Sequence, residues 1–142
     1  MTIQEIQEEI VDEFAMFDEE NWDERYQYVI DLGKTLPIID EKYKTESNII
    51  KGCQSKVWLH GEMQDGKVVF SADSDAILTK GIIAILIRTF SHHEPSEILK
   101  SDTGFIDKIG LKEHLSPTRA NGLVSMIKQI KMYALAFESQ NN

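Results

Sequence analysis

The strongest constraint on the fold is a pair of alternating apolar segments on either side of Asp65-Gly66. Asp-Gly is a favoured pair for the type I′ turn that joins two antiparallel strands. Counting outward from the turn places Leu59 opposite Ala72 and gathers apolar side chains on one face, which we expect to be the core side. The core-side residues are Val57, Leu59, Met63, Val68 and Phe70, and the opposite face carries Trp58, His60, Glu62, Val69 and Ser71.

The N-terminal segment predicts two helices. Thr2 and Glu5 form a capping box at the start of a helix that runs to Phe17, with apolar residues at helical spacing. Asn21 and Glu24 form a second capping box, which predicts a second helix.

A third predicted helix follows the hairpin, from about Asp75 to Phe90, with Asp73 and Ser74 as its cap. It is apolar on most faces, which is typical of a central buried helix. Gly81 lies inside it and costs roughly 1 kcal/mol relative to alanine. We therefore expect Gly81 to permit close packing.

Shorter helices are predicted at residues 95–100 and 105–109, and Ser116-Pro117 starts the last helix as cap and first-turn proline. Ile49-Ile50 is a candidate for a brief strand before the hairpin. The predicted fold class is therefore α+β, with a small antiparallel sheet of about three strands packed against several helices. A length of 142 residues predicts a single domain over residues 1–142.

The charge and hydropathy of the sequence exclude some classes of function. The net charge is −9, and residues 1–25 carry ten Asp or Glu and one Arg. Such an acidic chain repels phosphate backbones, so we expect no nucleic-acid partner. We interpret the acidic segment as a solvated helix face. No signal peptide or membrane-spanning apolar run is present, since Lys80 interrupts the longest one, and we expect a cytoplasmic protein.

Cys53 is the single cysteine, which excludes an internal disulfide, a C-x-x-C pair and a cysteine-rich metal site. Any sulfur chemistry must therefore involve a thiol on another molecule. Gly52 permits a tight turn that would present the thiol, although a free cysteine is more often a small buried hydrophobe. The His92-His93 pair lacks a further patterned ligand, so we expect solvent exposure and no metal site.

The segment Gly52-Cys53-Gln54-Ser55-Lys56-Val57-Trp58 resembles the G-C-Q-S-x-V-W signature of the SufE family, the sulfur-acceptor proteins of iron–sulfur cluster biogenesis. Four further blocks match in the same order, over roughly residues 20–136. They are Tyr26-Gln27-Tyr28-Val29-Ile30-Asp31-Leu32-Gly33, Asp73-Ser74-Asp75-Ala76, Lys80-Gly81 and His114-Leu115-Ser116-Pro117-Thr118-Arg119.

This resemblance implies a SufE/IscU-like fold and a defined function. A SufE protein accepts sulfur from a pyridoxal-phosphate cysteine desulfurase of the SufS type, stimulates that enzyme, and passes the sulfur to the SufBCD scaffold complex. The chain would need no cofactor of its own, because the pyridoxal phosphate belongs to the desulfurase. Among the matched residues, the expected roles are Cys53 as persulfide carrier, Gly52, Gln54 and Ser55 as loop support, and Asp75 and Arg119 in partner contact or loop control.

The residues around the thiol bear on its reactivity. Lys51 and Lys56 flank Cys53 and are expected to favour the thiolate, the nucleophilic form. An apolar pocket would instead raise the thiol pKa and slow its reactions. Arg119 lies in a first helical turn, where the helix dipole disfavours a cation. It is either a tolerated surface residue or one that holds an anion or a partner's carboxylate.

Several alternatives remain open. The desulfurase partner is alternatively of the related CsdA type, and a non-catalytic adaptor would keep Cys53 buried. A cluster-building scaffold needs more than one cysteine, and a cysteine hydrolase needs a histidine base that no spacing links to Cys53. The oligomeric state is also open, with a weak homodimer as one alternative.

Overall fold

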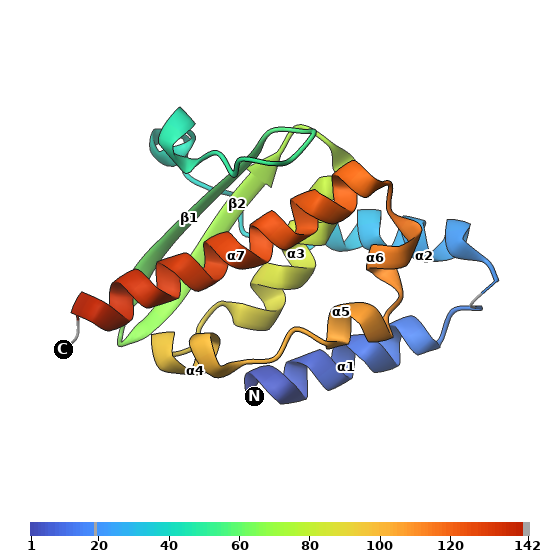
Figure 1. Cartoon of the computed structure of the whole chain (residues 1–142), viewed down its shortest axis with the longest axis horizontal. Coiled ribbons are helices and arrows are strands. Elements are labelled where there is room, and N and C mark those ends of the chain that lie inside the picture. The colour runs from blue at the N-terminus through green and yellow to red at the C-terminus, as the bar shows by residue number, and fades with distance from the viewer. Residues whose placement is uncertain (19, 141–142) are drawn as a thin grey trace.

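The computed structural model describes residues 1–18 and 20–140, in which an antiparallel β-hairpin packs at one side of a group of helices (Figure 1). This confirms the predicted α+β class. Three short 3₁₀ helices, η1 (Gly33–Thr35), η2 (Glu41–Tyr43) and η3 (Glu46–Asn48), precede the hairpin. The other elements are α1 (Ile3–Ala15), α2 (Trp22–Leu32), β1 (Val57–Gln64), β2 (Lys67–Ser74), α3 (Ile77–Phe90), α4 (Pro95–Lys100), α5 (Phe105–Lys108), α6 (Leu111–His114) and α7 (Pro117–Gln140).

The hairpin has the predicted register and turn. Leu59 pairs with Ala72, and Asp65 and Gly66 have φ angles of 52° and 80°, as a type I′ turn requires. The predicted core face is buried, except that Met63 is only half-buried. The opposite face is mostly half-buried because the segment with η2 lies over part of it.

Over residues 1–18 and 20–140 the sheet has two strands, so the prediction of about three is wrong. Ile49 makes only an isolated bridge to Trp58 beside β1. On the free edge of β2, Ile38 bridges to Ala72 and His93 bridges to Val68. These single bridges satisfy edge groups that a third strand would otherwise pair, and they block edge-to-edge association.

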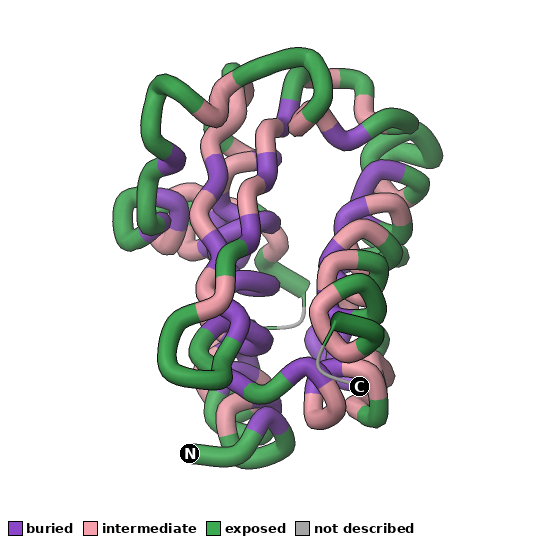
Figure 2. Tube along the Cα trace, turned by 90° about the vertical axis from the view of Figure 1, so that its left-hand side faces the viewer, coloured by how far each residue is buried: buried purple, intermediate pink, exposed green. Residues whose placement is uncertain are grey.

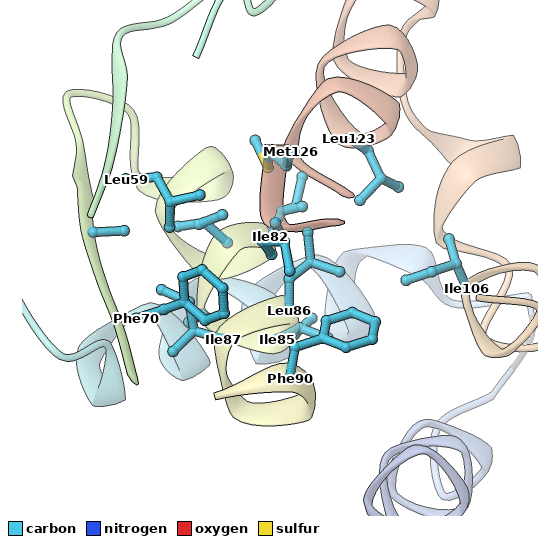
Figure 3. Packing of buried hydrophobic residues seen from close by; sticks show 14 of the residues in the cluster. Leu59, Phe70, Ile82, Ile85, Leu86, Ile87, Phe90, Ile106, Leu123 and Met126 are labelled. Carbon is cyan, nitrogen blue, oxygen red and sulfur yellow. The ribbon is translucent and has the colours of Figure 1, made fainter. Parts of the chain in front are cut away.

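Helix α3 is the centre of the core. Ten of its fourteen residues are buried, as expected for a helix that is apolar on most faces. Figure 3 shows Leu59 and Phe70 from the hairpin and Met126 from α7 around the α3 residues Ile82 and Leu86. In Figure 2, α7 turns its buried side toward this core and its exposed side outward.

The predicted start of α3 is wrong. Asp73 and Ser74 are the last residues of β2, and α3 begins only at Ile77, without a side-chain cap. The difference arises because the polar side chains are used elsewhere. Asp73 accepts a hydrogen bond from Lys44 at 3.0 Å, and Asp75 bonds to the loop that carries Cys53.

Two of the three other predicted helix caps are present. The Thr2–Glu5 capping box forms at α1, and the backbone N–H of Arg119 donates to the Ser116 hydroxyl at 3.3 Å at α7. The predicted Asn21 cap is wrong, because its side chain makes no capping hydrogen bond to α2. Among the described residues, none of the helices is long and apolar enough to cross a membrane.

Two arginines attach the acidic N-terminal helices to the core, and the sequence did not predict either contact. Arg25 is 6% exposed and donates to the carbonyls of Phe17 at 3.0 Å and Ile109 at 3.3 Å. Arg88 of α3 donates to Glu13 of α1 at 2.9 Å. The Arg88 guanidinium lowers the pKa of Glu13, so this carboxylate stays ionised and paired at neutral pH.

Gly81 confirms the expectation of close packing. A Cβ atom at Gly81 would lie 2.0 Å from the carbonyl oxygen of Val29 in α2. The atoms that the Cβ would meet first are backbone atoms of Val29, so a side-chain movement cannot relieve the overlap.

We expect Gly81→Ala to lower the free energy of unfolding by at least about 2 kcal/mol in urea denaturation, because it overpacks the α2–α3 contact. Helix propensity alone predicts that Gly81→Ala raises the free energy of unfolding by roughly 1 kcal/mol. The sign of the measured change therefore separates overpacking from helix propensity. Gly66→Ala is the control, since its Cβ would meet nothing within 4 Å. Its cost should be only about 1 kcal/mol, from the positive φ. A Gly81→Ala protein as stable as wild type would contradict the packing.

Candidate functional site: the Cys53 loop

The candidate site is built on a loop, residues 51–56, that connects the Ile49–Ile50 segment to β1. The backbone N–H of Ile50 donates to the Val57 carbonyl at 2.8 Å and closes the base of the loop. Gly52 has a φ of +93°, a conformation that other residues rarely adopt. A Cβ at Gly52 would also lie 2.7 Å from the Ser125 hydroxyl oxygen of α7. Glycine is therefore required for the loop to turn onto α7.

Three hydrogen bonds hold the end of the loop to the connection between β2 and α3. The Asp75 carboxylate accepts from the backbone N–H of Lys56 at 3.0 Å, and the Asp75 N–H donates to the Lys56 carbonyl at 3.2 Å. The Ser74 hydroxyl donates to the same carbonyl at 2.9 Å. A carboxylate acceptor makes the first of these bonds stronger than a neutral one.

Helices α3 and α7 form the floor under the thiol. Cys53 is half-buried, and its Sγ lies 3.7 Å from the carbonyl oxygen of Gly122. A Cβ at Gly122 would lie only 3.2 Å from this sulfur, so a larger residue would press on the thiol. The cavity of about 10 Å³ has room for about one water molecule. It is lined by Cys53, Gln54, Ser55, Thr79, Ile82, Arg119, Gly122 and Met126.

Burial raises the pKa of the Cys53 thiol, so the neutral form is favoured in this conformation. The expectation that Lys51 and Lys56 favour the thiolate is therefore wrong for the loop as it lies in this structure. Both lysines are exposed to water, which weakens their effect on a half-buried sulfur. The thiol is held in a poorly reactive state.

The structure brings the predicted site residues together. Gln54, Ser55 and Arg119 line the same cavity as Cys53, and Asp75 binds the end of the loop. Arg119 is exposed, and it lines this cavity from the first turn of α7.

The histidines lie elsewhere. His60 stacks on Tyr43 with ring centroids 3.6 Å apart, and in the described chain no histidine lines the Cys53 cavity. His93 is buried, so the expected solvent exposure of the His92-His93 pair is wrong for that residue. Over residues 1–18 and 20–140, no group of three His, Cys, Asp or Glu residues is placed to hold a metal ion.

The sequence alone did not indicate the residues under the Cys53 loop, chiefly Gly122, Ser125 and Thr79. One signal was available. A glycine inside a helical pattern, such as Gly122, often marks a close approach, as it does at Gly81. Nothing in the sequence indicates which segment approaches it, because that contact joins residues 69 positions apart.

Comparison with known proteins gives the family. Residues 8–134 match the family model described as "SufE: Fe-S metabolism associated domain". The chain belongs to the SufE family. An uncharacterized SufE-like protein of Rhizobium meliloti is 46% identical over 132 residues, which cover 89% of this chain and 93% of the relative. A second one, from Rhizobium etli, is 43% identical over 129 residues, 87% of this chain and 86% of the relative.

A solved structure supports the fold. The solution structure of a hypothetical protein from Thermus thermophilus matches with a TM-score of 0.75 and 20% identity, over 92% of this chain and 94% of that one. The SufE match associates the chain with iron–sulfur metabolism.

The raised thiol pKa predicts slow, pH-shifted alkylation. We expect iodoacetamide to modify native Cys53 more slowly than a free thiol at neutral pH, with an inflection at higher pH, because only the thiolate reacts. Unfolding in urea should restore an ordinary rate and inflection. A native inflection below that of the unfolded chain would show that the flanking lysines outweigh burial.

Proposed function

We propose that this SufE-family protein is a sulfur acceptor in which Cys53 receives persulfide sulfur from a pyridoxal-phosphate cysteine desulfurase of the SufS type. The observation that carries the proposal is the placement of the single cysteine. Cys53 stands near the tip of a glycine-dependent loop that is held to the protein by hydrogen bonds at its two ends rather than by packing on all sides. A purely structural thiol needs no such loop.

The transfer is an exchange between sulfur atoms. The Cys53 thiolate attacks the terminal sulfur of the donor's cysteine persulfide, a new S–S bond forms, and the donor's own sulfur leaves as a thiolate. Oxidation states balance, so no oxidant or reductant enters the step. The acceptor contributes one thiol and its position, and we propose that it needs no cofactor and no metal of its own.

The same reaction can serve further steps. Removal of the persulfide from the donor regenerates its free thiol, which would stimulate the desulfurase. We propose that the loaded sulfur then passes to a SufBCD-type scaffold. A CsdA-type desulfurase fits the same chemistry as an alternative donor.

The half-buried thiol favours one other candidate, an adaptor that binds the desulfurase without accepting sulfur. In the closed loop the thiol is neutral and partly covered by α7. Acceptance therefore requires the loop to move outward on docking, with Gly52 absorbing the change in backbone angles. The two functions differ in whether the sulfur of Cys53 changes.

We expect the intact mass to rise by one or more sulfur atoms after incubation with a SufS-type desulfurase and cysteine. The added mass should disappear with a reductant. Cys53→Ser should fold as wild type and stay unchanged in mass, since no other thiol is present. Unchanged wild-type mass, with the desulfurase active on free cysteine and bound to the chain, would favour the adaptor.

Docking should also expose the thiol. We expect Cys53 to alkylate faster in the complex than in the free protein, and Asp75→Ala to raise the free-protein rate roughly five- to tenfold by removing a charge-assisted bond to the loop. Asp73→Ala is the matched control, because Asp73 binds Lys44 instead of the loop. If hydrogen exchange over residues 50–56 and alkylation are the same in free and docked protein, the loop does not open on docking.

A further inference from the structure

Charge is distributed unevenly around the thiol. Three segments meet at the Cys53 end of the molecule, residues 40–56, 73–80 and 116–128, which Lys44–Asp73, Lys56–Asp75 and Gly52–Ser125 contacts join. Together they carry seven Lys or Arg and five Asp or Glu. The whole chain has a net charge of −9, so this end is cationic on an otherwise strongly acidic protein.

Two of the five acids at this end, Asp73 and Asp75, are already engaged. Asp73 pairs with Lys44 at 3.0 Å and with Lys80 at 3.5 Å. Asp75 binds the backbone N–H of Lys56 at 3.0 Å, which leaves the lysine ammonium free of it. These two acids therefore do not pair with the side chains of Lys51, Lys56 or Arg119.

Three exposed cations lie on the segments that hold Cys53 or line its cavity. Lys51 and Lys56 lie in its loop, and Arg119 lines its cavity from α7. Among the described residues, the ion pairs of the protein include none of these three side chains. Ile77, at the start of α3 next to this loop, is 68% exposed and adds an apolar contact. Arginine and apolar side chains together are typical of a protein interface.

We infer that the Cys53 end docks onto an acidic surface of the sulfur donor, whose carboxylates pair with Lys51, Lys56 and Arg119. The inference rests on the proposed function and specifies its partner. An acidic donor repels most of this chain, so attraction at one end selects the orientation that brings the two thiols together. Complementary potentials of this kind raise association rates and suppress wrong orientations.

A protein is favoured over a nucleic acid as the occupant. The proposed contact uses three cations, Lys51, Lys56 and Arg119, and the acidic remainder of the chain would repel an extended phosphate backbone. A carboxylate cluster on a folded partner is compact, so it can contact the cationic end without approaching the acidic remainder of the chain.

Charged thiol reagents test the local potential without any partner. Cys53 is allowed to react at low salt with an anionic sulfonatoethyl or a cationic trimethylammonioethyl methanethiosulfonate, each of which transfers its thioalkyl group to the thiolate and releases methanesulfinate. Rates are normalised to those of free cysteine. We expect the anionic reagent to be preferred by wild type, despite the net charge of −9.

Two variants make the test specific. The double variant Lys51→Glu/Lys56→Glu should shift the ratio roughly tenfold toward the cationic reagent. Lys67→Glu changes charge at the hairpin turn, at the other end of β2, and should leave the ratio unchanged. A wild-type preference for the cationic reagent, or the same ratio of anionic to cationic rates in wild type and the double variant, would show that the Cys53 end is not cationic.

Sulfur loading by the SufS-type desulfurase of the same organism then tests the donor assignment. We expect the loading rate of wild type and Lys67→Glu to fall steeply with added salt, and the double variant to load at least tenfold more slowly at low salt. Salt-independent loading with equal rates would overturn the acidic-donor inference and leave sulfur acceptance standing. If wild type accepts no sulfur from an active donor, the proposed function fails, and the donor assignment fails with it. If duplex DNA slows sulfur loading as strongly as added salt does, the cationic end binds polyanions without specificity, and the acidic-donor inference is overturned.

Discussion

The whole structure depends on covering helix α3 on every side. Ten of its fourteen residues are buried, so leaving any face in water would expose a large apolar area. The hairpin, α2 and α7 each cover one side of α3, and Arg88 attaches α1 across its end. The approach of α2 is as close as backbones allow, because Gly81 meets the carbonyl of Val29.

The site is a consequence of the same packing. Thr79 and Ile82 of α3 and Gly122 and Met126 of α7 form one continuous floor, and the Cys53 loop closes over the point where these helices meet. The loop adds little to the core, so its resting position depends mainly on hydrogen bonds at its ends. A few bonds of roughly 1 kcal/mol each can be broken by docking, whereas a packed core position cannot be given up so easily.

Local signals in the sequence determined much of this account. The Asp65-Gly66 turn predicts the hairpin register, the all-round apolar pattern predicts the burial of α3, and a single cysteine after a glycine predicts the loop. Contacts between distant segments were not predictable. Neither composition nor spacing indicates which carbonyls buried Arg25 binds. The local pattern places Asp75 at a helix start, and it cannot show that Asp75 binds the backbone of Lys56, 19 residues away.

The proposed function depends on one step, the transfer of sulfur from a donor persulfide onto Cys53. The most direct measurement is a single-turnover transfer in which the donor desulfurase is first loaded with ³⁵S-persulfide, freed of cysteine, and mixed with this protein. We expect the label to move to the wild-type chain, to be released by reductant, and to stay on the donor when Cys53→Ser is used. Label that remains on the donor with wild type, or that appears equally on Cys53→Ser, would contradict the account.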